Sequence, residues 1–130
     1  NRVEYAKNNF GITSYPSLES FEDGSIDLII SNQSLEHIPD VRGNLDLIEQ
    51  KLSLGGVTYI AVPNSTKEKV FLKKGAFQPL EHINCFIPKS KNFLFSENMK
   101  YQMMLKNLRI GSGTIWLFKK VNNNLKQYAK

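Results

Sequence analysis

The sequence predicts an α/β fold in which two parallel strands flank a helix and an antiparallel hairpin follows. Two short, almost continuously apolar runs have the composition of buried strands: residues 25–31 (SIDLIIS), which suit a strand buried on both faces as in a parallel sheet, and residues 57–63 (VTYIAVP). Between them, apolar residues recur four, three and four positions apart, as on one face of a helix; they are Val41, Leu45, Ile48 and Leu52. Strand, helix and strand at this spacing predict a right-handed βαβ unit.

The first element along the chain is a helix predicted over residues 1–11. Val3, Ala6 and Phe10 fall on one helical face, and Gly11 is a natural end for a helix. Residue 1 is asparagine rather than methionine, and the helical pattern is already under way there. We therefore expect the chain to be a fragment of a longer protein.

The helix between the two strands has signals at both ends. Asp40 can cap its first turn, and the pair Gly55-Gly56 can end it. Pro63 is expected to end the second strand, because proline cannot donate a hydrogen bond to a sheet ladder. These signals predict a helix that starts after Asp40 and continues up to Gly55.

The second half of the chain is less regular. Residues 64–87 form a long connection whose structure the pattern does not predict, and long connections in compact domains are usually functional. Residues 88–98 are predicted to form a short helix, and residues 100–110 fit either a strand or a helix. Residues 114–121 are a predicted strand, which would make a hairpin with 100–110 if that segment is also a strand. We expect one domain over residues 1–121 and a polar tail over 122–130.

Composition narrows the class of protein. The 130 residues are 41% hydrophobic, which suits one globular domain, and no apolar run approaches the roughly 20 residues of a membrane helix. The net charge is +5, but the lysines are scattered and no aromatic residues alternate with them, so we expect a solvated basic surface rather than a nucleic-acid site. The single cysteine, Cys85, cannot form an internal disulfide, which predicts a reducing, cytoplasmic location.

The two histidines of the chain, His37 and His82, both lie in the tetrapeptide LEHI. The first copy follows the strand at residues 25–31, and ligands of open α/β sheets bind beyond the carboxyl ends of parallel strands. The polar residues at that strand end are Asn32, Gln33, Ser34, Glu36 and His37. They are therefore placed to contact a ligand, although such residues can equally hold the turn backbone and the start of the next helix.

Residues 23–64 (DGSIDLIISNQSLEHIPDVRGNLDLIEQKLSLGGVTYIAVPN) resemble the central block of the class I S-adenosylmethionine-dependent methyltransferases. Residues 81–90 (EHINCFIPKS) resemble a later block found in one branch of that family. Two positions depart from the family pattern, since Ile26 replaces a phenylalanine and residues 53–56 (SLGG) replace L-K-P-G-G. The resemblance covers residues 1–121 and implies a partial Rossmann-like methyltransferase fold with a C-terminal antiparallel hairpin.

The resemblance also implies S-adenosylmethionine as the cofactor. Ser17 and Leu18 match the third-strand end, where the family contacts adenine, and residues 32–34 (Asn32, Gln33, Ser34) match the segment beneath the methionine part of the cofactor. The family's glycine-rich loop and its ribose-binding acidic residue are not in the sequence, and residues 2–12 resemble the helix that follows them. We expect this chain alone to bind the cofactor negligibly.

The resemblance implies an acceptor site near the two histidines. The expected acceptor is a small molecule or a glycan, and we expect no membrane partner. His37 and His82 are the candidate catalytic residues, because a neutral imidazole can serve as general base for an oxygen acceptor. The segment also resembles the E-x-x-E-H motif of metal-dependent O-methyltransferases, but Gln33 replaces the first glutamate and is a poorer ligand. We therefore expect no metal, with Glu36, His37 and His82 as the residues that would hold one.

A different class of function stays open at this point. The chain could be a non-catalytic relative that has lost cofactor binding and serves as an interaction module. In either case, a strand at residues 25–31 without its family neighbour would leave an apolar edge exposed, which predicts self-association through that edge.

Overall fold

The computed structural model describes residues 2–64, 82–87, 89–90, 94, 101–110 and 113–122. Two α-helices, two 3₁₀ turns and four strands follow one another along these ranges: α1 (Arg2–Phe10), η1 (Leu18–Ser20), β1 (Ile26–Asn32), η2 (Leu35–His37), α2 (Val41–Lys51), β2 (Leu52–Pro63), β3 (Tyr101–Ile110) and β4 (Gly113–Lys120). None of the helices found in these ranges is long and apolar enough to cross a membrane.

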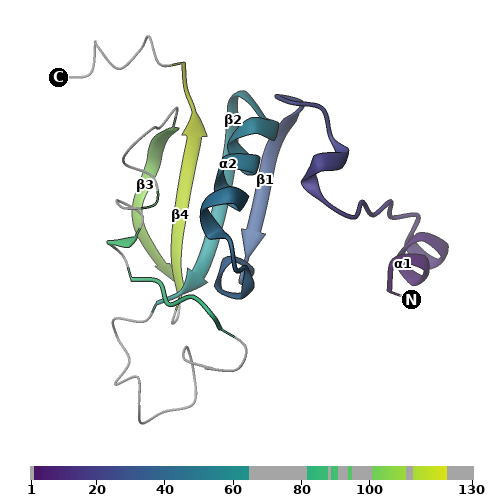
Figure 1. The fold of residues 1–130 in the computed structure, drawn as a ribbon, viewed down its shortest axis with the longest axis horizontal. Helices are drawn as coiled ribbons and strands as arrows, with labels where there is room; N and C mark the ends of the chain where they lie inside the picture. The colour runs from purple at the N-terminus through teal and green to yellow at the C-terminus, as the bar shows by residue number, and fades with distance from the viewer. Residues whose placement is uncertain are drawn as a thin grey trace.

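The four strands form one mixed sheet in the order β1-β2-β4-β3 (Figure 1). β1 and β2 are parallel, whereas β4 is antiparallel to both β2 and β3. The α/β class, the parallel pair and the C-terminal hairpin predicted from the sequence are therefore confirmed. Within the ambiguous segment at residues 100–110, Tyr101–Ile110 form a strand, because they pair along β4.

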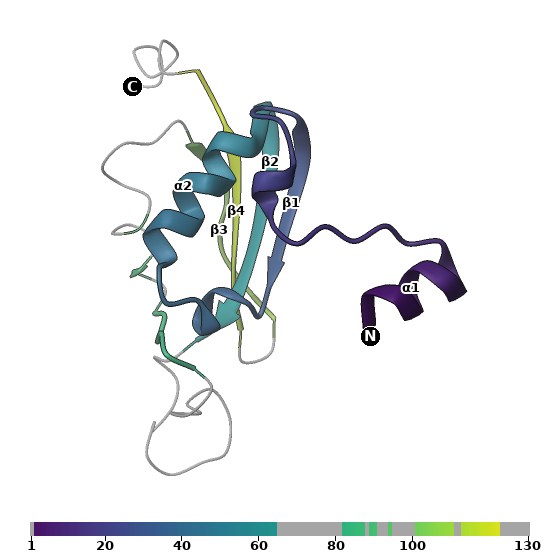
Figure 2. The same cartoon turned by 45° about the vertical axis from the view of Figure 1, so that its right-hand side comes forward.

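Helix α2 connects the parallel strands and covers one face of the sheet (Figure 2). Its apolar stripe packs into a core that includes these buried side chains: Ile29, Leu35, Leu45, Ile48, Leu52, Ile60, Val62, Phe86, Trp116 and Phe118. The predicted N-cap is confirmed, since the Asp40 Oδ1 accepts a hydrogen bond of 2.8 Å from the backbone N–H of Gly43.

The predicted end of this helix is wrong. α2 ends at Lys51, four residues before Gly55, and the chain enters β2 directly at Leu52. The Lys120 ammonium group donates to the backbone carbonyls of Glu49 and Leu52, at 2.6 Å each, and so satisfies acceptors at the helix end. Gly55 lies instead where the β1–β2 register shifts, and its φ of 86° is one that glycine adopts without strain.

The predicted burial of β1 on both faces is also wrong. Of its residues only Ile29 is buried, while Leu28 and Ile30 are 55% and 63% exposed. In the described sheet β1 pairs with β2 alone, and α2 covers only one of its faces. The apolar composition of the run therefore predicted the strand but not how far its side chains are buried.

Helix α1 confirms the predicted first helix but buries none of its residues. It lies away from the sheet on the far side of β1, as both ribbon views show (Figures 1 and 2). Its Phe10 is 67% exposed, and the Phe10 ring packs edge to face with the ring of Tyr5 in the same helix, at 6.0 Å between centroids. The amphipathic pattern therefore predicted the helix correctly but not its packing.

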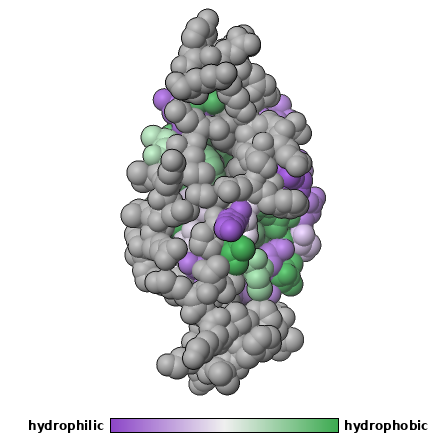
Figure 3. Space-filling model, turned by 90° about the vertical axis from the view of Figure 1, so that its left-hand side faces the viewer, coloured by the Kyte–Doolittle hydropathy of each residue, from purple (hydrophilic) through white to green (hydrophobic). Residues whose placement is uncertain are grey.

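Three predictions fall largely outside the described residues. They concern the long connection, of which only Asn64 and residues 82–87 are described, most of the short helix at 88–98, and the tail from residue 123. From the β3 side of the molecule, the described surface shows hydrophilic and hydrophobic side chains interspersed (Figure 3).

Candidate functional site

The candidate site lies at the carboxyl ends of β1 and β2, where the first LEHI segment leaves the sheet. Gln33 follows the last residue of β1 and has a φ of 51°, the one positive φ among the described residues other than glycine. That left-handed conformation costs a side-chain-bearing residue roughly 1–2 kcal/mol. The Gln33 N–H donates 2.9 Å to the carbonyl of Ala61 in β2, so the sheet holds the turn in this conformation.

The residues at this turn present polar groups to solvent. Asn32, Gln33 and Ser34 are all exposed, and the Ser34 hydroxyl donates 3.1 Å to the carbonyl of Asn32. Within the described ranges, no hydrogen bond occupies the side-chain amides of Asn32 and Gln33. These amides are available to a ligand at the strand end, whereas the Ser34 hydroxyl is engaged in the turn.

The other two residues that were matched to a cofactor lie in and beside η1. The Ser17 hydroxyl caps this turn by accepting 3.1 Å from the N–H of Glu19, and Leu18 packs half-buried against the core. The turn lies alongside α2 and the sheet rather than at the strand ends (Figures 1 and 2). A role for Ser17 and Leu18 in cofactor binding stays a prediction.

The first LEHI segment forms η2, whose side chains divide between the core and the surface. Leu35 is fully buried, and Glu36 is only 1% exposed although it carries a carboxylate. His37 is on the outside, with 44% of its side chain exposed. A 3₁₀ turn with an apolar residue packed into the core thus carries a buried acid and an accessible imidazole side by side.

Asn84 attaches residues 82–87, which begin with the histidine of the second LEHI segment, to the first LEHI segment. Its backbone N–H donates 3.0 Å to the carbonyl of Glu36, and its side-chain amide donates to the carbonyls of Leu35 and Ile38, at 3.2 and 2.6 Å. Buried carbonyls need such partners, so Asn84 fixes residues 82–87 against η2. Sequence reasoning did not identify Asn84; the one signal was an asparagine two residues after the second histidine.

This attachment brings the two histidines together. The rings of His37 and His82 pack edge to face with 4.9 Å between centroids, and the His37 Nε2 lies 3.9 Å from the Glu36 Oε1. One ligand atom from each of Glu36, His37 and His82 lies within 4.8 Å of the others. The two histidines therefore lie together at the carboxyl ends of the parallel strands, while their catalytic role stays a prediction.

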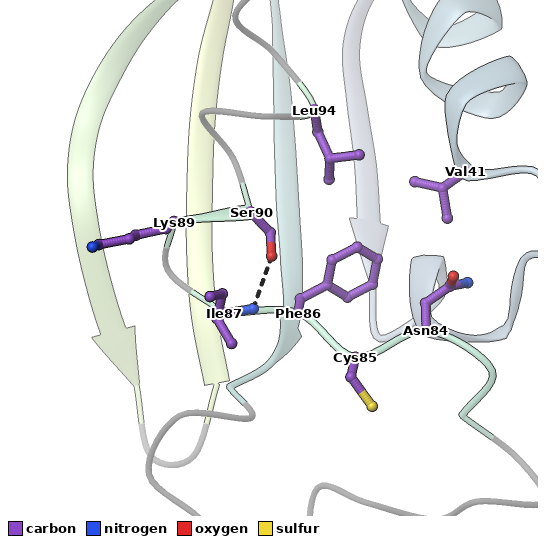
Figure 4. Close-up of a pocket in the computed structure, with 8 residues that line it drawn as sticks. All are labelled: Val41, Asn84, Cys85, Phe86, Ile87, Lys89, Ser90 and Leu94. Atoms are coloured by element: carbon purple, nitrogen blue, oxygen red, sulfur yellow. Dashed lines mark hydrogen bonds between the residues drawn. The ribbon is translucent and has the colours of Figure 1, made fainter.

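A cavity of about 370 Å³ opens beside this cluster (Figure 4). Its lining is mostly apolar and comes from the start of α2 and from the segment that follows His82: Val41, Asn84, Cys85, Phe86, Ile87, Lys89, Ser90 and Leu94. Phe86 is held by edge-to-face packing on Trp116 at 5.9 Å, and the Ser90 hydroxyl accepts 3.0 Å from the N–H of Ile87. A concave apolar surface therefore adjoins the imidazole pair, as expected of a small-molecule pocket.

Comparison with known proteins gives one family and one fold. The family model described as "Methyltransferase domain" matches residues 3–98. No curated protein sequence matches the chain. The family match includes both LEHI segments and the whole βαβ unit.

Three solved structures share the fold. A proposed type 11 methyltransferase from Sulfolobus solfataricus aligns over 98% of this chain and 69% of its own, with a TM-score of 0.63 and 13% identity. A SAM-dependent methyltransferase from Archaeoglobus fulgidus aligns over 90% and 72%, with a TM-score of 0.60 and 14% identity. A SAM-dependent methyltransferase from Methanosarcina mazei aligns over 91% of this chain and 75% of its own, with a TM-score of 0.62 and 17% identity. At these identities the likeness is one of fold.

Proposed function

Because the chain belongs to the class I S-adenosylmethionine-dependent methyltransferases, we propose that it supplies the acceptor side of a methyl-transfer site for a small molecule or a glycan. The observation that carries this proposal is the contact between His37 and His82 at the carboxyl ends of the parallel strands. Imidazoles at this edge, beside an apolar cavity, suit an acceptor whose reacting oxygen is close to a base.

Methyl transfer depends more on aligning the reacting groups than on covalent catalysis by the protein. S-adenosylmethionine supplies an activated methyl group on a sulfonium, so the protein needs to hold acceptor, methyl and sulfur in line. In the proposed site, the cavity beside Phe86 holds the acceptor body, and His82 or His37 accepts the proton from the acceptor hydroxyl. The contact of the two rings lets one imidazole orient the other.

The residues available for the cofactor fit one part of it. The unoccupied side-chain amides of Asn32 and Gln33 support a place for the methionine end beside β1. Ser17 could accept a hydrogen bond from the adenine amino group, as the family resemblance suggests, although its hydroxyl also caps η1. The glycine-rich loop of the family is not in these 130 residues. We expect titration calorimetry of the chain alone with S-adenosylmethionine to detect negligible heat, and a micromolar affinity would contradict this part of the proposal.

The proposal is tested by following S-adenosylhomocysteine release from the full gene product with a panel of hydroxylated small molecules and glycans. We expect His82→Asn and His37→Asn to lower kcat about 10²–10⁴-fold, the usual contribution of a general base, with little change in KM for the cofactor. Asp46→Asn, on the exposed side of α2, is the control and should keep full activity.

Two results would contradict the proposal. An unchanged kcat in both histidine variants would show that neither imidazole takes part in the reaction. A full gene product that binds no S-adenosylmethionine and methylates no member of the panel would favour the non-catalytic interaction module instead.

Location and self-association belong to the same proposal. The exposed, free thiol of Cys85 supports a reducing, cytoplasmic compartment, and recovery of the protein from a secreted fraction would contradict it.

The exposed Leu28 and Ile30 on the terminal strand of the described sheet support self-association of the isolated chain through β1. Light scattering that shows a monomer at all concentrations tested would contradict that association.

A further inference from the structure

The cavity beside the imidazole pair has three apolar side chains that face one another. Val41 at the start of α2, Phe86 and Leu94 point toward a common space (Figure 4). Phe86 is 5% exposed and packs on Trp116, whereas Val41 and Leu94 are half-buried at the border of the core. These walls offer a bound molecule dispersion contacts rather than hydrogen bonds.

Polar groups of the described lining are already used by the fold. The side-chain amide of Asn84 donates to two carbonyls in and beside η2. The Ser90 hydroxyl accepts from the N–H of Ile87 at 3.0 Å. A glycan carries many hydroxyls, and each one that loses water without gaining a partner weakens binding. The described walls are therefore poorly suited to a sugar.

The charge of the lining also restricts what can bind. Lys89 is the one charged residue among the described lining residues, and its ammonium group points away from the space that Val41, Phe86 and Leu94 share (Figure 4). A charged molecule that entered this space would lose its hydration without meeting a counter-ion there. The walls therefore favour an uncharged body.

The size and position of the cavity fit the body of a small acceptor. Its volume is about 370 Å³, and an apolar cavity of about 150 Å³ is enough to hold benzene, so a ring with an aliphatic chain has room. Asn84 lines the cavity two residues after His82 and is attached to η2, which carries His37. A body bound in the cavity can thus direct its hydroxyl toward the imidazole pair.

We propose that Val41, Phe86 and Leu94 determine which acceptor binds, and that they select an uncharged molecule with a ring-sized apolar body and a reacting hydroxyl. Glycans and anions are then excluded from the site. Because it names the acceptor of the same site, this selectivity rests on the proposed function.

The experiment compares three probes by titration calorimetry on the full gene product without cofactor. Para-isopentylphenol is uncharged, para-hydroxyphenylpropionate has the same shape with a carboxylate at the end of the chain, and cellobiose is a glycan. We expect the dissociation constant of para-isopentylphenol to be at least about tenfold below that of the carboxylate, the usual effect of a small apolar group in a pocket, and cellobiose to give no saturable heat. Equal or tighter binding of the carboxylate or of cellobiose would overturn the proposal, and so would a failure of para-isopentylphenol to bind.

Variants of the walls test where the probe binds. Leu94→Asn should raise the dissociation constant of para-isopentylphenol about tenfold, and Val41→Thr, which keeps the shape of the wall but adds a hydroxyl, should raise it in the same direction. Leu54→Asn is the matched control, since Leu54 is 68% exposed in β2 and does not line the cavity, and it should bind as the unaltered protein does. Undiminished binding in both wall variants would overturn the proposal. The comparison of probes uses the unaltered protein and so remains decisive if a variant fails to fold.

Turnover with S-adenosylmethionine separates this selectivity from the proposed function. We expect para-isopentylphenol to be methylated and cellobiose to be left unchanged. Methylation of cellobiose alone would overturn the choice of acceptor but would leave methyl transfer at this site standing. Selective binding of para-isopentylphenol, with no methylation of any acceptor, would support the selective cavity and contradict the proposed function instead.

Discussion

The βαβ unit (residues 26–63) and the amino-terminal segment (residues 2–16) contain helices of similar length that differ in burial. α2 buries Leu45, Ile48 and Lys51, whereas α1 buries none of its residues. Both helices follow an apolar stripe in the sequence. Most of the stability of a protein helix comes from packing its apolar face. Both stripes therefore predict a helix correctly, but only the packed stripe of α2 contributes much to the stability of the fold.

The difference teaches what periodicity can and cannot predict. A spacing of three and four residues indicates which face of a helix is apolar, but the sheet that would cover that face belongs to the tertiary structure. The face of α2 meets its own two strands, which are adjacent in sequence. The face of α1 has no such neighbour among the described elements, since none of its residues is buried. Leu28 and Ile30 of β1 are likewise exposed.

The largest expected effect comes from making the same change, isoleucine to alanine, in each of the two regions. Ile48→Ala removes a side chain that is 2% exposed and should lower the free energy of unfolding by about 2–5 kcal/mol. Ile12→Ala removes one that is 53% exposed and should change it by less than about 0.5 kcal/mol. Urea denaturation followed by fluorescence of the single, buried Trp116 measures both. Equal losses would mean that the amino-terminal segment packs in solution.

The next effect concerns the attachment of residues 82–87 to the βαβ unit. Asn84→Ala leaves the carbonyls of Leu35 and Ile38 without their donor and should cost about 1–3 kcal/mol. The matched control is Asn9→Ala in α1, whose amide donates to the Tyr5 carbonyl at an exposed position and should matter little. The same denaturation experiment compares them. A neutral Asn84→Ala would show that the two LEHI segments are not held together by this side chain.

A smaller effect is expected at the start of α2. Asp40→Ala removes the acceptor of the Gly43 N–H and should destabilise the protein by about 1 kcal/mol. Asp46→Ala, an exposed position in the same helix, should be neutral or slightly stabilising because alanine has the higher helix propensity. If both variants lost the same stability, the loss would reflect charge rather than capping.

The smallest expected effect is a pH dependence of stability that comes from Asp23, just before β1. Hydrogen bonds from Lys51 at 2.7 Å and Gln50 at 2.9 Å hold the pKa of Asp23 below its usual 3.8. Because the folded pKa is the lower one, this contribution to stability is present above 3.8 and is lost as the pH falls through the folded pKa. Asp23→Asn should therefore lose less stability than the unaltered protein between about pH 5 and about pH 2. Parallel acid curves for the two proteins would contradict the assignment.

Local patterns predicted the parts of the fold that local sequence controls. The two parallel strands, the N-cap at Asp40 and the C-terminal hairpin depend on neighbouring residues, and all are present. The end of α2 depends instead on Lys120, which is remote in sequence and satisfies the helix-end carbonyls. The exposure of β1 likewise depends on which strands lie beside it, and its composition alone could not predict that.

The site was predictable to a similar degree. The rule that ligands bind at the carboxyl ends of parallel strands indicated the turn at residues 32–37. The position of His82 required the long connection to return to that turn, which it does through the hydrogen bonds of Asn84. The burial of Glu36 was not predicted, because its side chain turns inward from a polar segment and only the packing of η2 explains it.

The central claim is that the two LEHI segments form one site, and the chain's two histidines allow a direct test. With only the histidine rings labelled, a nuclear Overhauser spectrum should contain a cross-peak between the ring protons of His37 and His82, because their rings are in contact at 4.9 Å. Asn84→Ala should weaken the cross-peak. A folded protein that gives no cross-peak between the two rings would contradict the account.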